Sequence, residues 1–137
     1  MRRHVARIQG MCEKQGMKPR AKIIAMANMG DDPTLMLNAP DPAAMKVLAK
    51  PGLTKNDIDI FEIQVACDVG GGQFIRELGL DRSKFKPDGG SVALGHPTDA
   101  IRIGNALVEP ERIERRAKRV TMHFAGGMAP ATNIESF

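Results

Sequence analysis

The chain has no tryptophan and no tyrosine, and its large aromatic side chains are five phenylalanines. Proteins that bind single-stranded nucleic acids stack the bases on aromatic side chains, so this sequence lacks the usual platforms. The net charge of +4 is concentrated at residues 1–4 and 112–119, and Glu109, Glu111 and Glu114 intersperse the second cluster. This mixture is typical of a solvated helix face. We therefore expect no nucleic-acid partner, while attraction of the basic residues to the phosphates of a coenzyme stays open.

Cysteine is scarce, and long hydrophobic runs are absent. Cys12 and Cys67 have neither metal-type spacing nor the pattern of a disulfide framework, which indicates structural thiols in a reducing compartment. His96, His123 and Cys67 could converge in space, but no pair has a local ligand spacing, so we expect no metal site. No apolar run approaches the roughly 18 residues needed to span a bilayer, so we expect no membrane partner.

The chain contains enough apolar residues to form the core of one domain. A chain of 137 residues with 42% hydrophobic content can bury a core without disulfides or metals. The first dozen residues are basic and contain no acid before Glu13. A mitochondrial transit peptide has that bias but is usually longer and serine-rich. We therefore expect a cytoplasmic protein, with a mitochondrial location as the alternative.

The first half of the chain predicts alternating elements. Residues 22–27 have the pattern of a short buried strand, followed by a turn cluster at 28–33. Asp41 is expected to be the N-cap of a helix, with Pro42 at its first position and Pro51-Gly52 after its end. Its expected apolar face consists of Ala43, Ala44, Val47 and Leu48.

A second cap at residues 54–57 precedes an alternating pattern at 58–65 that predicts a strand. Helical spacing follows, with Gly79 placed to end the helix. Gly70-Gly71-Gly72 lies at the expected start of this helix and predicts a frayed first turn. A phosphate-binding loop is the alternative, but the Lys-Ser/Thr ending of a P-loop is missing.

The last third predicts a helix and two closing strands. The helix spans residues 101–117 with a break or kink at Pro110, and the strands span 118–124 and 131–134. A small-residue turn at 125–128 separates the two strands. The alternation of strands and helices along the chain predicts a layered α/β domain.

Two segments each place a histidine in a small-residue turn after an apolar run. They are Gly89 to Pro97, which contains Gly95-His96-Pro97, and Val120 to Met128, which contains His123. Imidazole is the side chain best suited to move protons near neutral pH. Glycine beside it lets a substrate approach closely.

These segments resemble the C-terminal half of a thiolase, the family that makes or breaks carbon–carbon bonds between acyl-CoA thioesters. The likeness runs collinearly from Lys18-Pro19-Arg20-Ala21 to Phe137 and includes residues 32–37, 61–63 and 128–131. It implies an α/β fold like that half, a layered sheet with packed helices. It also implies a domain at residues 18–137 after a basic extension at 1–17.

The resemblance implies roles for the residues at its motifs. His96, held by Gly95 and Pro97, matches the histidine that keeps the nucleophilic cysteine deprotonated and donates to the thioester oxygen. The alternative is an inherited turn histidine with nothing to activate. Gly95 and Pro97, together with Gly127, are also expected to contact the substrate.

His123 stands where the family has its second cysteine, which moves the α-carbon proton. Imidazole could move a proton there, but its bulk is expected to obstruct the cavity. Ala125 and Gly126 are at the turn whose N–H groups stabilise an oxyanion. Gln64 is at the position of the family's oxyanion asparagine, and Val65 replaces a glutamate. Both changes weaken the site.

The function implied is thioester carbon–carbon bond cleavage or formation in lipid degradation, with coenzyme A thioesters as substrates and no separate cofactor. The nucleophilic cysteine belongs to the family's N-terminal half, and Cys12 and Cys67 are in the wrong places to replace it. We therefore expect the chain to be inactive alone. One hypothesis is that a separate N-terminal half supplies the nucleophile. The alternative is a non-catalytic relic that binds acyl-CoA or another protein, which His123, Gln64-Val65, Gly70-Gly71-Gly72 and Pro110 favour. Pairing of two copies is expected to cover apolar surface.

Overall fold

The sheet defines the architecture of the chain. The computed structural model describes residues 9–35, 38–63, 68–85, 118–122 and 127–136. Its strands are β1 (Ala21–Gly30), β2 (Ile60–Ile63), β3 (Lys118–Met122) and β4 (Met128–Ser136). They form one sheet in the order β1-β4-β3-β2. Strand β2 runs parallel to β3, whereas β4 is antiparallel to both of its neighbours. The predicted mixed α/β architecture is confirmed.

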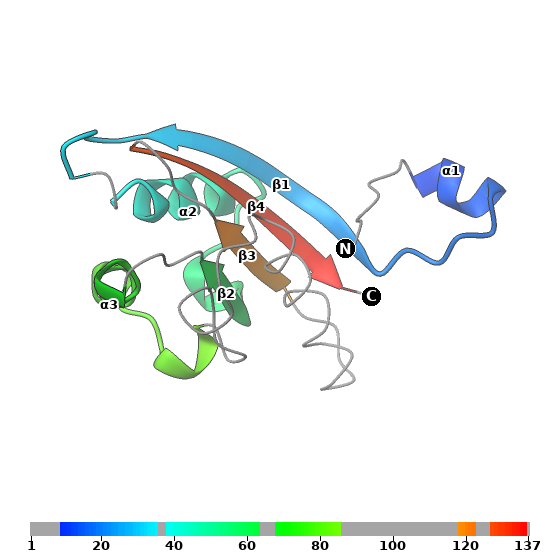
Figure 1. Cartoon of the computed structure of the whole chain (residues 1–137). Helices are drawn as coiled ribbons and strands as arrows, with labels where there is room; N and C mark the ends of the chain where they lie inside the picture. Colours follow the sequence, from blue (N-terminus) through cyan, green and yellow to red (C-terminus); the bar gives the residue numbers. More distant parts are fainter. Residues whose placement is uncertain (1–8, 36–37, 64–67, 86–117, 123–126, 137) are drawn as a thin grey trace.

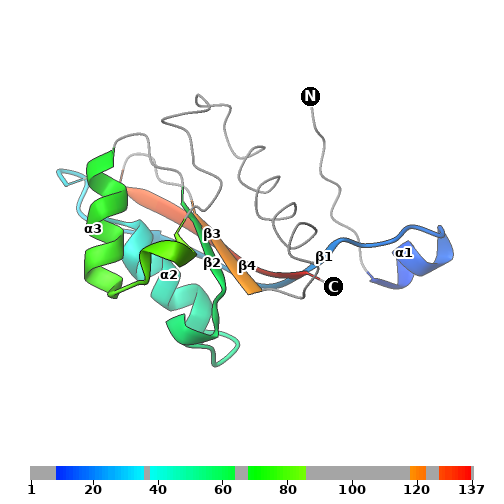
Figure 2. The same ribbon diagram turned by 90° about the horizontal axis from the view of Figure 1, so that it is seen from below.

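The helices are α1 (Gln9–Lys14), α2 (Pro40–Ala49) and α3 (Asp68–Leu78), with short 3-10 turns at η1 (Lys55–Asp57) and η2 (Arg82–Lys84). Helix α2 lies along β1 and β4, and α3 lies beside α2 (Figure 1). Helix α1 stands clear of the sheet, which is also evident in the view from below (Figure 2). The body of the described fold therefore begins at β1, and α1 projects from it.

The core fills the space between α2 and one face of the sheet. The predicted apolar face of α2 is confirmed, because Ala43, Ala44, Val47 and Leu48 are all buried. The sheet residues that share this core are Ala27, Phe61, Ile63, Ala129 and Ala131. The rings of Phe61 and Phe74 have centroids 6.1 Å apart, and those of Phe74 and Phe85 are 6.2 Å apart. This aromatic row joins β2, α3 and the segment after η2.

Two strands are longer than predicted. Residues 28–30, which the sequence predicts as a turn, continue β1, and β4 begins at Met128 rather than at residue 131. The two extensions pair with each other, Gly30 with Met128 and Asn28 with Pro130. Cross-strand hydrogen bonding thus overrides the local turn preference of glycine and asparagine. In contrast, β2 begins at Ile60 rather than at residue 58, and residues 64 and 65 of the predicted strand lie outside the described residues.

The helix ends confirm some cap predictions and correct others. Thr54 and Asp57 form the predicted capping box, and Gly79 ends α3 at φ 55°. The prediction that Asp41 is an N-cap is wrong, because α2 begins at Pro40 and Ala39 occupies the cap without a side-chain bond. Gly70-Gly71-Gly72 lie near the start of α3, which begins at Asp68, and the fraying of this turn stays a prediction. The predicted helix at 101–117 lies outside the described residues.

Asn133 is a polar residue in the middle of β4. It is fully buried, and neither its Nδ2 nor its Oδ1 has a hydrogen-bond partner in the described part of the chain. A buried amide without partners loses its hydration and gains nothing in return, which costs about 1–3 kcal/mol. Within the described residues, the burial of the Asn133 amide is thus offset by no hydrogen bond.

We expect Asn133→Leu to raise the free energy of unfolding by about 1 kcal/mol, because leucine has nearly the same shape and no polar atoms to desolvate. Urea unfolding followed by circular dichroism measures the change. Asn28→Leu, at an exposed position of β1, is the matched control and should stay within about 0.5 kcal/mol of the parent. A loss of stability in Asn133→Leu would show that the amide has a partner in solution.

Candidate functional site

The candidate site lies at the edge where the parallel strands end. Strands β1, β2 and β3 run in the same direction, so their carboxyl ends and the start of β4 share one edge of the sheet. Ile63 at the end of β2 pairs with Met122 at the end of β3. Ligands of open α/β sheets bind outside the carboxyl ends of the strands. The geometry therefore points to this edge as the place for chemistry.

Most residues predicted for the site fall outside the described part of the chain. These are Gln64, Gly95, His96, Pro97, His123, Ala125 and Gly126, so their proximity to one another stays a prediction. Gln64 and His123 are the residues that follow Ile63 and Met122 in the chain. Gly127 is the described member of the set.

Gly127 packs tightly against the loop that follows β1. Its backbone has φ 75°, and a Cβ placed on it would lie 3.1 Å from Asp31 O and 3.1 Å from Pro33 Cα. The Asp31 N–H donates to the Gly127 carbonyl at 2.8 Å. Only glycine combines this left-handed conformation with such a close approach. Gly127 thus joins the start of β4 to the end of β1.

The loop held by Gly127 is organised by its own aspartates. The Thr34 N–H donates to Asp32 Oδ1 at 2.7 Å, and the Asp32 N–H donates to Asp31 Oδ1 at 2.8 Å. The Thr34 backbone bond, followed by the Thr34 hydroxyl, lowers the pKa of Asp32. The sequence predicted a turn at residues 28–33 but not its contact with Gly127, and Asp-Asp-Pro-Thr is a typical signal for a side-chain-stabilised turn.

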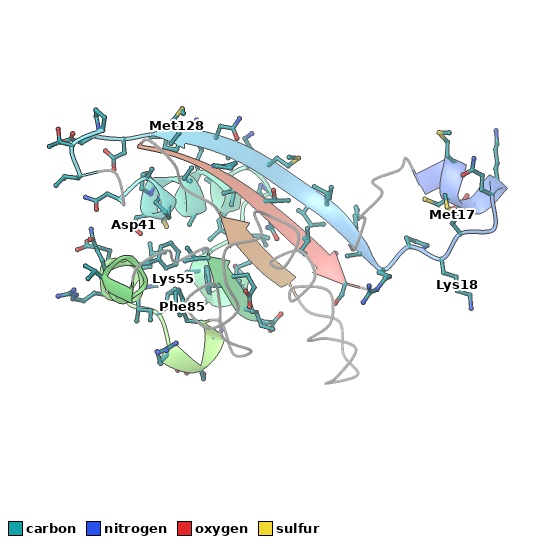
Figure 3. The ribbon with its side chains drawn as sticks, in the orientation of Figure 1. Met17, Lys18, Asp41, Lys55, Phe85 and Met128 are labelled. Atoms are coloured by element: carbon teal, nitrogen blue, oxygen red, sulfur yellow. The ribbon has the colours of Figure 1, made fainter. Side chains whose placement is uncertain are left out.

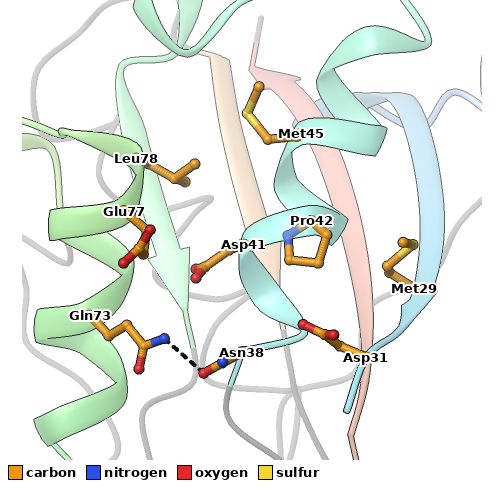
Figure 4. Close-up of a pocket in the computed structure, with 9 residues that line it drawn as sticks. All are labelled: Met29, Asp31, Asn38, Asp41, Pro42, Met45, Gln73, Glu77 and Leu78. Carbon is orange, nitrogen blue, oxygen red and sulfur yellow. Dashed lines mark hydrogen bonds between the residues drawn. The ribbon is translucent and has the colours of Figure 1, made fainter. Parts of the chain in front are cut away.

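A second feature is an acidic groove between α2 and α3, an open hollow of about 580 Å³ (Figure 4). Its lining residues are Met29, Asp31, Asn38, Asp41, Pro42, Met45, Gln73, Glu77 and Leu78. Gln73 Nε2 donates to Asn38 Oδ1 at 2.7 Å and links α3 to the loop before α2. Asp41 is the groove residue that is labelled in the wider view, in the first turn of α2 (Figure 3).

Asp41 is an acid of this groove whose pKa is strongly shifted. Partial burial, followed by the repulsion of the Glu77 and Asp31 carboxylates, raises the pKa of Asp41 to about 6. Asp41 points from α2 toward α3, where Glu77 lies (Figure 4). A carboxylate in the first turn of a helix is normally favoured by the helix dipole, so desolvation and like charges outweigh the dipole here. The sequence did not predict this group, because its acids come from three separate segments of the chain.

The described residues contain no group of three His, Cys, Asp or Glu side chains arranged to hold a metal ion. Cys12 is a free and buried thiol on α1, while Cys67 lies outside the described residues. Among the described helices, none is long and apolar enough to cross a membrane.

Comparison with known proteins gives one consistent result. Residues 17–136 match the family "Thiolase, C-terminal domain". The chain is 39% identical over 114 residues to the 3-oxoadipyl-CoA/3-oxo-5,6-dehydrosuberyl-CoA thiolase of Escherichia coli, covering 82% of this chain and 28% of the relative. It is 34% identical over 126 residues to the cytosolic acetyl-CoA acetyltransferase of Mus musculus, covering 90% of this chain and 32% of the relative.

A solved structure agrees with this result. The Acat5 thiolase of Ascaris suum, crystallised in complex with coenzyme A, superposes with a TM-score of 0.85 at 32% identity. The match covers 95% of this chain and 34% of that chain. The chain therefore spans about a third of the length of the relatives it matches.

We expect Gly127→Ala to destabilise the fold by about 1–3 kcal/mol, because a Cβ cannot be accommodated at positive φ against the Asp31–Pro33 backbone. Thermal unfolding measures the loss. Gly16→Ala is the matched control, since Gly16 also has positive φ but has no atom within 4 Å of the added Cβ. Equal losses in the two variants would mean that the close approach contributes nothing.

The raised pKa of Asp41 predicts a pH dependence of stability. The folded state binds the Asp41 proton more tightly than the unfolded state, where the pKa is near 3.8. The Asp41 contribution is thus greatest below pH 3.8 and is lost as the pH rises to about 6. Asp41→Asn cannot titrate, so its stability relative to the parent should increase across this interval. Urea midpoints at several pH values measure the difference, and parallel curves would contradict the assignment.

Proposed function

Because this chain belongs to the thiolase family, of which it carries the C-terminal domain, we propose that it serves acyl-CoA C-acyltransfer. The reaction is the cleavage or formation of a carbon–carbon bond between thioesters, and we place it in lipid degradation. The observation that carries the proposal is the family match over residues 17–136, joined to a superposition on a coenzyme A-bound thiolase. Coenzyme A and its thioesters are the proposed ligands, without a separate cofactor.

The proposed site gathers around the carboxyl ends of β2 and β3. His96, supported by Gly95 and Pro97, would accept a proton and donate to the thioester oxygen. Gln64 would take the place of the oxyanion asparagine. The paired ends Ile63 and Met122 support this proposal, because Gln64 and His123 follow them directly in the chain.

The proposed oxyanion donors are the backbone N–H groups of Ala125 and Gly126, with Gly127 contacting the substrate. The left-handed turn at Gly127 supports this role, because such turns aim successive N–H groups toward one point. His123 would face the α-carbon of the substrate, where a thiol acts in the family.

We further propose that the 137 residues are inactive alone and act with a separate N-terminal half that supplies the nucleophilic cysteine. Cys12 is an unsuitable substitute, since it is buried on α1, and α1 stands apart from the sheet edge (Figure 1). A domain at residues 18–137 after a basic extension fits this division. A cytoplasmic location is proposed because the mouse relative is named as cytosolic.

A second candidate function is non-catalytic binding of acyl-CoA or of another protein. The observation that favours it is an exposed apolar face on the side of the sheet opposite α2. Ile23, Met26 and Met128 are 49%, 59% and 63% exposed there, and such surfaces mark contact sites. The occupant would be the N-terminal half or a second copy.

The test is an amide NMR titration of the chain with coenzyme A, repeated with His96→Ala. In the parent, we expect coenzyme A to shift the amide signals around Gly127. In the variant, we expect the dissociation constant for coenzyme A to rise at least threefold. Mixing with a thiolase N-terminal half should then restore thiolysis of acetoacetyl-CoA, but only with His96 present. Binding without restored thiolysis would favour the non-catalytic function, and a spectrum unchanged by coenzyme A would contradict both coenzyme A roles.

A further inference from the structure

Strand β1 is an edge strand, and its own sequence contains little that would prevent another strand from pairing with it. It lies at one end of the described sheet and is ten residues long. Lys22 is its single charged residue. An edge strand of this kind presents unpaired N–H and C=O groups to any other strand that approaches. Something outside β1 must therefore occupy these groups if the edge is to stay closed.

The pairing register identifies which carbonyls face outward. Asn28 lies opposite Pro130 of β4, and proline has no N–H to donate. Residues in an antiparallel ladder alternate between pairs that exchange hydrogen bonds and pairs that do not. The Asn28–Pro130 pair is of the second kind, so the Asn28 backbone faces away from β4. Met26, two residues earlier, faces the same way.

Two lysines of the helix layer bind these outward carbonyls. Lys46 Nζ donates to the Asn28 carbonyl at 3.0 Å, and Lys50 Nζ donates to the Met26 carbonyl. Lys46 lies in α2 and Lys50 is its C-cap. Four helical residues advance about 6 Å, and two strand residues advance about 6.7 Å. The spacing of the lysines thus matches the spacing of the carbonyls.

We propose that Lys46 and Lys50 close the outer edge of β1 against pairing with β1 of a second copy of this chain. Each ammonium occupies the place where the N–H of an added strand would donate. A second copy is the fitting occupant, because a strand pairs with itself antiparallel about a two-fold axis. Moreover, β1 has almost no charge to oppose such pairing. This inference goes beyond the proposed function, since it concerns the edge rather than the apolar face or the thioester site.

The test is the double variant Lys46→Met/Lys50→Met, in which the aliphatic stems stay and the ammonium groups are removed. Sedimentation velocity over a concentration series measures self-association. We expect the dissociation constant for self-association to fall at least tenfold relative to the parent. Hydrogen exchange should also show new protection of the Met26 and Asn28 amides.

The matched control is Lys55→Met/Lys84→Met. It makes the same change in net charge and also removes two lysine–carbonyl bonds, to Leu78 and Ile58, which are not in β1. We expect it to associate like the parent. Equal association in the two double variants would overturn the proposal, because charge loss alone would then explain the effect.

A third variant separates edge pairing from nonspecific aggregation. In this variant, Asn28→Pro is added to Lys46→Met/Lys50→Met. Proline removes the backbone N–H of residue 28, which points away from β4, so the hydrogen bonds between β1 and β4 are kept. It should return the association to the level of the parent. Lys46→Arg/Lys50→Arg keeps the donors and should also behave like the parent. Circular dichroism confirms folding, and association that persists after Asn28→Pro would overturn the edge-pairing inference.

Discussion

Alanine side chains allow α2 to lie directly on the sheet, and other features of the fold depend on that close contact. Ala43 and Ala44 on the helix meet a sheet surface that includes Ala27, Ala129 and Ala131, and all five are buried. Larger side chains would move the helix outward and strain the packing. At this distance the lysines of α2 reach the edge of β1, and Asp41 is close enough to α3 to lose part of its hydration.

Strand β1 depends on contacts from outside at two places. Lys46 and Lys50 bind the carbonyls along its outer side, and Gly127 binds the loop after its carboxyl end. Each contact satisfies a backbone group that β4 cannot reach. The contact with Gly127 fixes the position of the Asp31–Thr34 loop beside the edge where the parallel strands end. In the proposed function, that edge is where the thioester reacts.

The sequence predicted much of the local structure. Thr54 with Asp57, and Gly79 after α3, were identified by residue type and spacing because caps depend on adjacent residues. The lengths of β1 and β4 were not, because the pairs that extend them, such as Gly30 with Met128, join residues far apart in the chain. Asp41 was misplaced by two positions in its helix, because Pro40 and Pro42 both suit a first turn.

The sequence by itself determined the family and the α/β class, because these depend on residue identity and order, whereas the motif residues of the proposed site stay a prediction. Only the tertiary structure decided that Gly127 packs on Asp31 and Pro33 and that two lysines bind the edge of β1. It also decided that the pKa of Asp41 rises to about 6. These properties depend on the distances between segments that are far apart in the chain and on their exposure to solvent. Neither quantity can be derived from the order of neighbouring residues.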